Sequence, residues 1–503
     1  MSDVKSNEAD GYLRSMSVRR NTLYNLAGAT VPIVLALVTV PLYLRVIGTA
    51  RYGVLAIVWL ILSYFGTFDL GLSRAAANRI AQMRHGPATE REQVFWTACL
   101  LNSGIGAAAG LGLYVAGGQM LEHWFRMSGS LHAEAARALP WMAIAVPIAT
   151  VTAALTGTLE GLQRFSTVNV IQSVGTALFQ TVPLVTAYAV GPQLQYVIPA
   201  AVIARLVTAL PLFSAVRRAL PLTGPPRMHA GYARQLIAYG SWVAVTNLVG
   251  PILHVFDRFL VGIVLGASAV AYYVVPFQLV NRSQIVPGAL SRALFPHLSV
   301  VDSAEARAVS IDAVVTLAAI MTPLTIIGLL VIAPFLRLWV GSTFASHAIP
   351  VGEILLFGIW INGLAFVPFA LLQARGRPDV VAKFHLLEVV PFLLILWFAL
   401  TRIGIAGAAT AWTLRVTIDA ALLFIAADLP LAAAKPLVPG AALIAATALC
   451  LHLFPSPTAL PRLYLGGLLL LLSCAWSILI SAHVRQLVSR LWRHLNAIRG
   501  DQS

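Results

Sequence analysis

The sequence predicts an all-α, polytopic membrane protein, and three observations carry this prediction. Of the 503 residues, 59% are hydrophobic and 11% are charged, with a mean hydropathy of +0.82. A soluble chain of this size cannot bury so much apolar surface. The apolar residues form continuous runs of about 20, which is the length at which an α-helix crosses a bilayer core. No alternation of apolar and polar residues over about ten positions is found, which excludes a β-barrel.

We expect about 14 transmembrane helices from the length and spacing of these runs. Their predicted starts are Thr22, Tyr52, Val94, Ala138, Ser166, Gln195, Leu236, Ala271, Ile311, Pro350, Val381, Ile405, Pro436 and Tyr464. An even number of spans places both termini on the same side of the membrane. The loops and tails on that side contain roughly three times as many Lys and Arg residues as the loops on the other side. The positive-inside rule therefore predicts cytoplasmic N- and C-termini.

The net charge of +15 follows the membrane topology, because the cations lie in short loops between apolar runs. Nucleic acid is therefore not an expected partner. Three isolated cysteines, Cys99, Cys450 and Cys474, lie inside apolar runs with no CxxC spacing, so neither a zinc site nor a disulfide framework is expected. The sequence has no GxxxxGK[ST] motif, which excludes an ATP motor within this chain, and no cofactor is predicted.

An internal repeat organises the chain. NLAG at Asn25–Gly28 recurs as NLVG at Asn247–Gly250, and LSRA at Leu72–Ala75 recurs at Leu290–Ala293. The turn with Gly48 and Tyr52 likewise recurs with Gly266 and Tyr272. An even number of spans separates the copies, which predicts a parallel repeat of two six-helix lobes with a substrate path between them.

The repeat also predicts the division of the chain into segments, of which the last two helices form an appendage outside the repeat. The segments are a cytoplasmic N-terminal segment at 1–21, a first lobe at 22–218, a cytoplasmic linker at 219–235, a second lobe at 236–429, two additional transmembrane helices at 430–482 and a basic tail at 483–503. In this tail, apolar residues share one helical face with arginines around it. We expect either an interfacial helix on anionic lipid or a plain positive-inside tail.

Three stretches carry a resemblance to a known family. They are NLAG…VPLYLRVIGTARYGVLA…FDLGLSRA at the start, FDRFLVGIVLGASAVAYYVVPFQLV…LSRALFPHLS at Phe256–Ser299, and LLQARGRPDVVAKFHLLEVV…GIAGAATAW at Leu371–Trp412. The order and spacing of these three stretches resemble those of the O-antigen and exopolysaccharide flippases of the multidrug/oligosaccharidyl-lipid/polysaccharide exporter superfamily. The resemblance extends over nearly the whole length of the chain.

The resemblance implies a flippase of the bacterial inner membrane. Such a protein moves undecaprenyl-pyrophosphate-linked oligosaccharide to the outer leaflet, by alternating access, for O-antigen, capsule or exopolysaccharide synthesis. Membrane lipid and a polysaccharide polymerase are the partners that this function implies. The alternatives are a cation-coupled multidrug exporter, a flippase for the peptidoglycan lipid precursor, and a glycan polymerase or ligase. The absence of a large outer loop argues against the enzyme.

Four arginines within the predicted spans are candidates for binding a pyrophosphate group: Arg205, Arg258, Arg282 and Arg415. Ionised groups inside a membrane are costly, and a guanidinium offers several donors to phosphate oxygens. The competing interpretation is internal pairing, which we favour for Arg415 with Asp419 at i,i+4. Adjacent residues point apart on a helix, so we expect Asp257 to be a poor partner for Arg258, whose alternative role is an interfacial contact.

Further polar residues are assigned to gates, lobe contacts or structure. We assign Asn25, Asn247 and Asp257 to gate or lobe contacts, in which the asparagines bind sugar hydroxyls or, as we favour, bridge helices. Arg45 and Arg51 are expected to anchor lipid headgroups at the outer mouth, and Asp69 is interpreted as structural. The pairs Gly106/Gly110 and Gly157/Gly161 are expected to serve ordinary close packing of helices.

Overall fold

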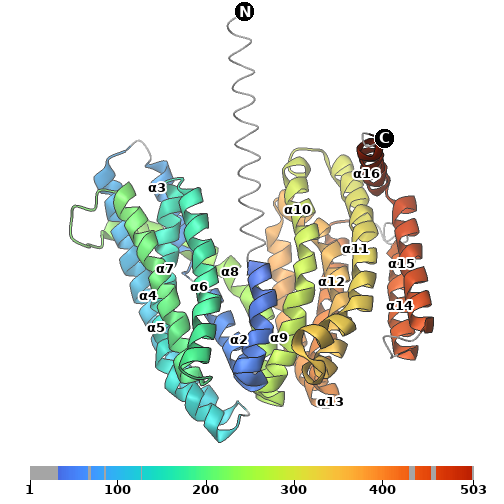
Figure 1. The fold of residues 1–503 in the computed structure, drawn as a ribbon. Helices are drawn as coiled ribbons and strands as arrows, with labels where there is room; N and C mark the ends of the chain where they lie inside the picture. Colours follow the sequence, from blue (N-terminus) through green and yellow to red (C-terminus); the bar gives the residue numbers. More distant parts are fainter. Residues whose placement is uncertain are drawn as a thin grey trace, which may run out of the picture. The chain divides into compact units, whose positions relative to one another are not determined.

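The structure, a computed structural model, describes residues 32–65, 69–83, 86–125, 127–429, 437–454 and 460–500, and in these ranges the side chains except those of 63–65, 241–255, 491 and 494–500. All regular secondary structure in these ranges is helical, so the predicted all-α class is confirmed (Figure 1). The predicted segment at 1–21 and the gate residue Asn25 lie outside the described residues, as does the side chain of Asn247.

Eight helices in the described ranges are long and apolar enough to cross a membrane. They are α4 (Ala88–His123), α5 (Gly129–Gly161), α6 (Phe165–Ala189), α7 (Leu194–Ala219), α11 (Ser303–Val340), α12 (Ser342–Ala374), α13 (Pro378–Ala426) and α15 (Leu460–Ile480). Shorter apolar helices cover Pro32–Val46, the Gly48–Leu62 part of α2 (Gly48–Phe65), and α14 (Val438–Leu453). The remaining helices are α3 (Leu72–Gln82), α8 (Ala230–Leu265), α9 (Ala267–Asn281), the 3-10 helix η1 (Arg282–Gln284), α10 (Ile285–Leu298) and α16 (Ala482–Gly500).

The longest helix, α13, is two helices joined at Gly404. This glycine has φ 63° and ψ −143°, which divides α13 into a first arm at 378–403 and a second arm at 404–426. A positive φ is sterically easy only for glycine, so the side chain of any other residue would strain this turn. The division agrees with the sequence, which predicts separate spans from Val381 and Ile405.

The chain divides into two compact units, Met1–Pro251 and Ile252–Ser503. The division falls inside α8, after the linker predicted at 219–235. The start of α8 packs within the first unit, where Leu236 joins a buried cluster with α3 and α4. The linker is also bound there, because the Glu92 carboxylate of α4 accepts the Gly224 N–H at 2.9 Å and the Thr223 hydroxyl at 3.3 Å.

Small residues set the close contact of α4 with α5 in the first unit. A Cβ added at Gly106 would overlap the Thr150 hydroxyl and would lie 2.6 Å from Cα of Pro147. A Cβ at Gly110 would meet the carbonyl of Ala143. The two backbones therefore approach only because these positions have no side chain, as the small-residue spacing predicts.

Glycines without side chains also allow α3 to pack closely against the C-terminal end of α5. A Cβ at Gly157 would overlap the carbonyl oxygen of Ser73, and a Cβ at Gly161 would lie 2.6 Å from the carbonyl oxygen of Ala77. Asp69 starts α3, since its carboxylate accepts the N–H groups of Gly71 at 3.0 Å and Ser73 at 2.6 Å. The structural interpretation of Asp69 fits these contacts, which satisfy donors at a helix N-terminus.

The internal repeat is visible in the backbone of each unit. Gly48 and Gly266, equivalent in sequence, both have left-handed φ values, 81° and 90°. The turn after α5 and the turn after α12 also match. Each turn contains one residue with a left-handed backbone, Gln163 at φ 60° and Gly376 at φ 68°. In both turns the N–H of this residue donates to the carbonyl three residues earlier, and the N–H of the next residue donates to the carbonyl five residues before it.

The helical path is interrupted before the LSRA motif in both copies. In the first unit, Leu70 at φ 51° and Gly71 at φ 73° precede α3, which begins at Leu72. In the second unit, η1 separates α9 from α10, which contains Leu290–Ala293. A short 3-10 segment within a helical path replaces the α-helical hydrogen bonds by i→i+3 bonds and often marks a hinge or a sequence under strain.

The two additional helices, α14 and α15, pack against α11 in the second unit (Figure 1). A Cβ at Gly440 of α14 would lie 2.9 Å from the hydroxyl oxygen of Thr322 in α11. A Cβ at Gly466 of α15 would lie 2.7 Å from a methyl carbon of Leu330 in α11. Close packing on α11 thus fixes both helices to the second unit.

Candidate functional site

The four candidate arginines fall into two classes. Arg258 and Arg415, both in the second unit, are buried and each forms an ion pair with a carboxylate. Arg205 in the first unit and Arg282 in the second form no ion pair with a carboxylate of the described residues. The structure therefore separates two arginines that are neutralised by a carboxylate from two that form no ion pair among the described residues.

Arg258 pairs with its neighbour Asp257, at the end of α8. The Arg258 Nη1 lies 3.1 Å from Asp257 Oδ1, and the Arg258 backbone N–H donates to the same oxygen at 2.7 Å. The Tyr273 hydroxyl of α9 donates to Oδ2 at 2.8 Å. The expectation that Asp257 is a poor partner was wrong, because the long arginine side chain folds back and places its guanidinium over the Phe277 ring, 4.7 Å from the centroid.

Arg415 bridges the two arms of α13. Its Nε lies 3.1 Å from Oε2 of Glu388, whereas Asp419 lies 3.8 Å from Nε2 of His385. The predicted i,i+4 pair of Arg415 with Asp419 is therefore not the one formed. The turn at Gly404 folds the arms together, so that the nearest carboxylate to Arg415 comes from the opposite arm.

Aromatic rings join these two pairs into one buried network in the second unit. Phe277 receives the Arg258 guanidinium and contacts Trp412 edge-on, with ring centroids 5.2 Å apart. Trp412 lies one turn before Arg415 on the same arm. This network, which we call the α13 network, contains the carboxylates of Asp257, Glu388 and Asp419 together with Arg258, Arg415 and His385. Its three carboxylates outnumber its two arginines.

Arg205 lies in the middle of α7 in the first unit. Its Cζ is 5.1 Å from the ring centroid of Phe179 in α6, and Phe179 in turn contacts Trp59 of α2 at 6.1 Å. The rings hold the guanidinium by cation–π attraction, which orients the charge without neutralising it. Arg205 is thus a cation that contacts an aromatic ring inside a helix that is apolar enough to cross a membrane.

Arg282 begins η1, at the break between α9 and α10. Its side chain is exposed, and it follows α9, which is mainly apolar but contains Ser268, Gln278 and Asn281. The sequence predicts that Arg282 lies about ten residues into a span, but α9, η1 and α10 are not among the candidate spans of the described residues. The break itself was not predicted, since Pro276 and Pro287 flank it at a distance and neither replaces a residue of η1.

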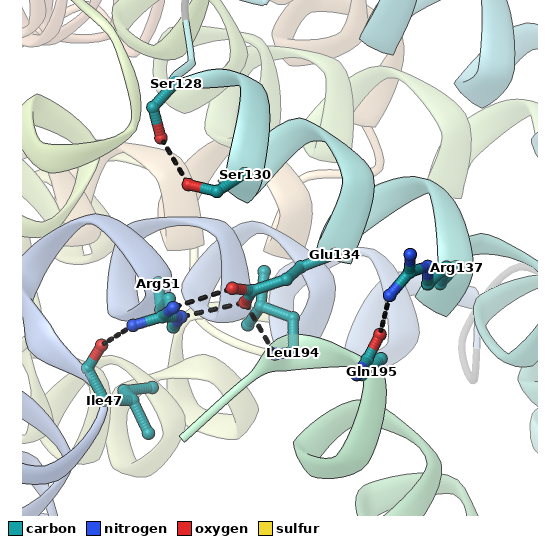
Figure 2. A network of polar contacts seen from close by, with 8 residues as sticks. All are labelled: Ile47, Arg51, Ser128, Ser130, Glu134, Arg137, Leu194 and Gln195. Atoms are coloured by element: carbon teal, nitrogen blue, oxygen red, sulfur yellow. Dashed lines mark hydrogen bonds and ion pairs between the residues drawn. The ribbon is translucent and has the colours of Figure 1, made fainter. Parts of the chain in front are cut away.

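At the end of the first unit that the loop charges predict to be outer, Arg51 is bound to Glu134 rather than free for lipid (Figure 2). The Arg51 Nε and Nη2 donate to the two Glu134 oxygens at 2.8 and 2.6 Å. Glu134 also accepts the backbone N–H of Leu194 at 3.0 Å. The predicted role of Arg51 as a headgroup anchor is corrected, while Arg45 is exposed. The contact ties α2 to the starts of α5 and α7.

Sequence reasoning missed Tyr273, Glu134 and His385. Each is brought to its partner by tertiary packing across 16 to 83 positions of sequence, for which no spacing rule gives a signal. Tyr273 alone carried a hint, since a tyrosine in an apolar span needs a partner for its hydroxyl.

Comparisons with known proteins agree with the fold. A family profile described as "Polysaccharide biosynthesis protein" matches residues 18–301. The chain is 30% identical over 412 residues to a Shigella flexneri protein named "Putative O-antigen transporter". The aligned region covers 81% of this chain and 97% of that protein.

Two solved structures share the fold at low sequence identity. A MATE-family multidrug transporter of the MOP superfamily has a TM-score of 0.67 at 12% identity, over 82% of this chain and 98% of that one. The lipid II flippase MurJ has a TM-score of 0.63 at 13% identity, over 93% of this chain and 100% of that one. At such identities the likeness concerns the fold alone.

The many apolar helices, the repeat and the buried charges define a multi-pass membrane protein with the fold of the MOP-superfamily transporters. The chain belongs to the polysaccharide biosynthesis protein family. The family predicted from the sequence motifs is therefore confirmed.

Proposed function

We propose that this protein is a flippase that moves an undecaprenyl-pyrophosphate-linked oligosaccharide across the bacterial inner membrane, by alternating access, for O-antigen, capsule or exopolysaccharide synthesis. Both termini are cytoplasmic in this proposal, as the loop charges predict. The protein transports and does not catalyse a reaction, and a polysaccharide polymerase takes up the delivered product.

One observation carries the substrate class: Arg205, inside the candidate membrane span α7, and Arg282, at the start of η1, have no carboxylate partner among the described residues. An unpaired charge in a membrane is costly, so its retention favours a role in binding. A pyrophosphate offers several negatively charged oxygens, and each guanidinium can donate two parallel hydrogen bonds to them.

Arg258 and Arg415 have a different role in this proposal. Their guanidinium groups are committed to Asp257 and Glu388, and their side chains are only 7% exposed. Freeing either arginine for a substrate would leave a buried carboxylate unpaired. They therefore stabilise the second unit, although the sequence groups them with Arg205 and Arg282.

The test is outer-leaflet delivery of the lipid-linked oligosaccharide in cells that lack their own flippase. We expect Arg205→Ala and Arg282→Ala each to abolish delivery while the protein remains expressed and membrane-inserted. Arg402→Ala is the matched control, because Arg402 is an exposed arginine that contacts the Phe398 ring of the same arm. Full delivery by both single variants and by the double variant would contradict the proposal.

The excess of carboxylates in the α13 network favours a second candidate, a cation-coupled exporter of amphipathic drugs. Asp257, Glu388 and Asp419 outnumber Arg258 and Arg415, and a cation would balance the remaining charge. Drug susceptibility in a strain without its own exporters separates the two functions. Protection against drugs that is lost in Asp419→Asn and kept in Arg205→Ala would favour the exporter.

A further inference from the structure

The helix α16 is amphipathic, and its apolar face is uncovered. Leu487, Val488 and Trp492 lie on one side of this helix and are 62%, 42% and 65% exposed. In the sequence, positions 491, 495 and 498 are also Leu or Ile and continue the same helical spacing. An apolar stripe of this width faces a core in a soluble helix, and here the described residues provide none.

The charge of α16 is of one sign. Arg485, Arg490 and Arg493 are exposed, Arg499 follows in the sequence, and Ala482–Gly500 contains no Asp or Glu. By helical spacing, Arg485 and Arg499 border the apolar side, while Arg490 and Arg493 lie across from it. A surface of this kind suits a partner that is apolar in one layer and anionic in the adjacent layer.

The first turn of α16 is fixed beside a membrane-crossing helix. Only Ser481 separates it from α15, which is apolar enough to cross a membrane. The Ser481 hydroxyl lies 3.1 Å from that of Thr316, and His483 Nδ1 lies 3.2 Å from Asp312 Oδ2, both partners being on α11. The Arg485 Nη2 donates to the carbonyl of Leu479 at 2.9 Å, which satisfies an acceptor at the end of α15.

These contacts hold the start of α16 against α11 at the end of the candidate span α15, and Figure 1 shows α16 turning away from α15 instead of extending it. A helix that leaves a span at this level lies among lipid headgroups. Its apolar side then reaches the acyl chains, and its arginines reach the phosphates.

We infer that α16 is a membrane-surface helix that binds anionic lipid, with Leu487, Val488 and Trp492 in the acyl boundary and the arginines on the headgroups. The inference is independent of the proposed transport function. Anionic lipid is the occupant because it combines both layers at this position, whereas a protein partner would require an acidic and apolar surface at the same membrane level.

The test uses the full-length protein in nanodiscs of phosphatidylcholine, with and without phosphatidylglycerol, and measures amide hydrogen exchange in 484–500. We expect slower exchange when phosphatidylglycerol is present. An arginine near an anionic surface accounts for about fivefold in binding, so R485E/R499E, which reverses the two charges that border the apolar side, is expected to lower this protection at least about 25-fold. Exchange in α11 reports whether the rest of the fold is intact.

Two further variants separate the apolar contact from charge. L487E/W492E is expected to abolish protection in phosphatidylglycerol nanodiscs, whereas Gln486→Glu, which alters charge on the opposite side of α16, retains it. Equal exchange in the two lipids would overturn the inference. So would protection that survives L487E/W492E, because α16 would then be covered by something other than the acyl boundary.

Discussion

Nε of Arg415 lies 3.1 Å from Oε2 of Glu388, across the two arms of α13 that meet at Gly404. Both residues are 7% exposed. The ion pair links positions 27 residues apart in sequence and closes a helical hairpin of the second unit. It assigns Arg415 to the stability of that unit, whereas Arg205 and Arg282 form no ion pair among the described residues and are the arginines that we propose to bind the substrate.

Removing the Arg415 side chain is expected to destabilise the protein strongly. In Arg415→Ala, Glu388 becomes a buried charge without its partner, and the free energy of unfolding falls by about 3–5 kcal/mol. Thermal unfolding of purified protein in detergent measures the loss. The double variant R415A/E388Q removes the orphaned charge and is expected to recover part of it. No recovery would contradict the pairing. Lys383→Ala, which removes an exposed pair with Asp379, is the control and should unfold like the wild type.

Gly106 is expected to tolerate no side chain. A Cβ there overlaps Thr150 on α5, so Gly106→Ala forces α4 and α5 apart and costs about 1–3 kcal/mol of unfolding free energy. Gly104 on the same helix has nothing within 4 Å of an added Cβ, so Gly104→Ala is the matched control. Thermal unfolding of the two variants compares them directly. A Gly106→Ala protein as stable as Gly104→Ala would refute the close approach of the helices.

The Tyr273 hydroxyl is expected to stabilise the second unit through its hydrogen bond to Asp257. Tyr273→Phe keeps the ring but removes the hydrogen bond to the buried Asp257 carboxylate, which lowers the free energy of unfolding by about 1.5–3 kcal/mol. Tyr272→Phe is the neighbouring control, since Tyr272 stacks on His347 with its ring. Thermal unfolding measures both. Equal stability of the two variants would show that Asp257 does not depend on Tyr273.

The Arg51–Glu134 contact is expected to make a small, salt-dependent contribution. Glu134→Gln retains an acceptor for the Leu194 N–H and loses the ion pair, which costs about 1 kcal/mol because Arg51 is partly exposed. Screening makes the wild type and the variant converge in molar salt. Arg45→Gln, an exposed neighbour, is the control in the same unfolding assay. A loss that is unchanged by salt would indicate that Glu134 acts through packing instead.

The fold was largely predictable from the sequence, because length, hydrophobicity and repeat are local or additive signals. Gly48 and Gly266 occupy equivalent positions in the sequence, and both have left-handed backbones, as the predicted repeat leads us to expect. The small-residue pairs, such as Gly106 with Gly110, likewise identify close helix contacts without knowledge of the partner helix.

The site was predictable only as a set of candidates. The cost of burying a charge singles out every ionised residue in a predicted span, so it selects Arg205, Arg258, Arg282 and Arg415 as candidates. Which arginine is neutralised depends on how helices are placed side by side. The partner of Arg415 follows from the turn at Gly404, and the pair of Arg258 with Asp257 follows from a side-chain conformation that an ideal helix does not specify.

Transport by the R205A/R282A double variant in proteoliposomes tests the central claim most directly. The substrates are the same oligosaccharide on undecaprenyl pyrophosphate and on undecaprenyl monophosphate, and the measured quantity is the initial rate of translocation. Each lost charge-assisted contact is worth about 1.5–3 kcal/mol, so pyrophosphate transport is expected to fall at least about 100-fold and the preference for pyrophosphate to disappear. An undiminished rate with the preference intact would contradict the account.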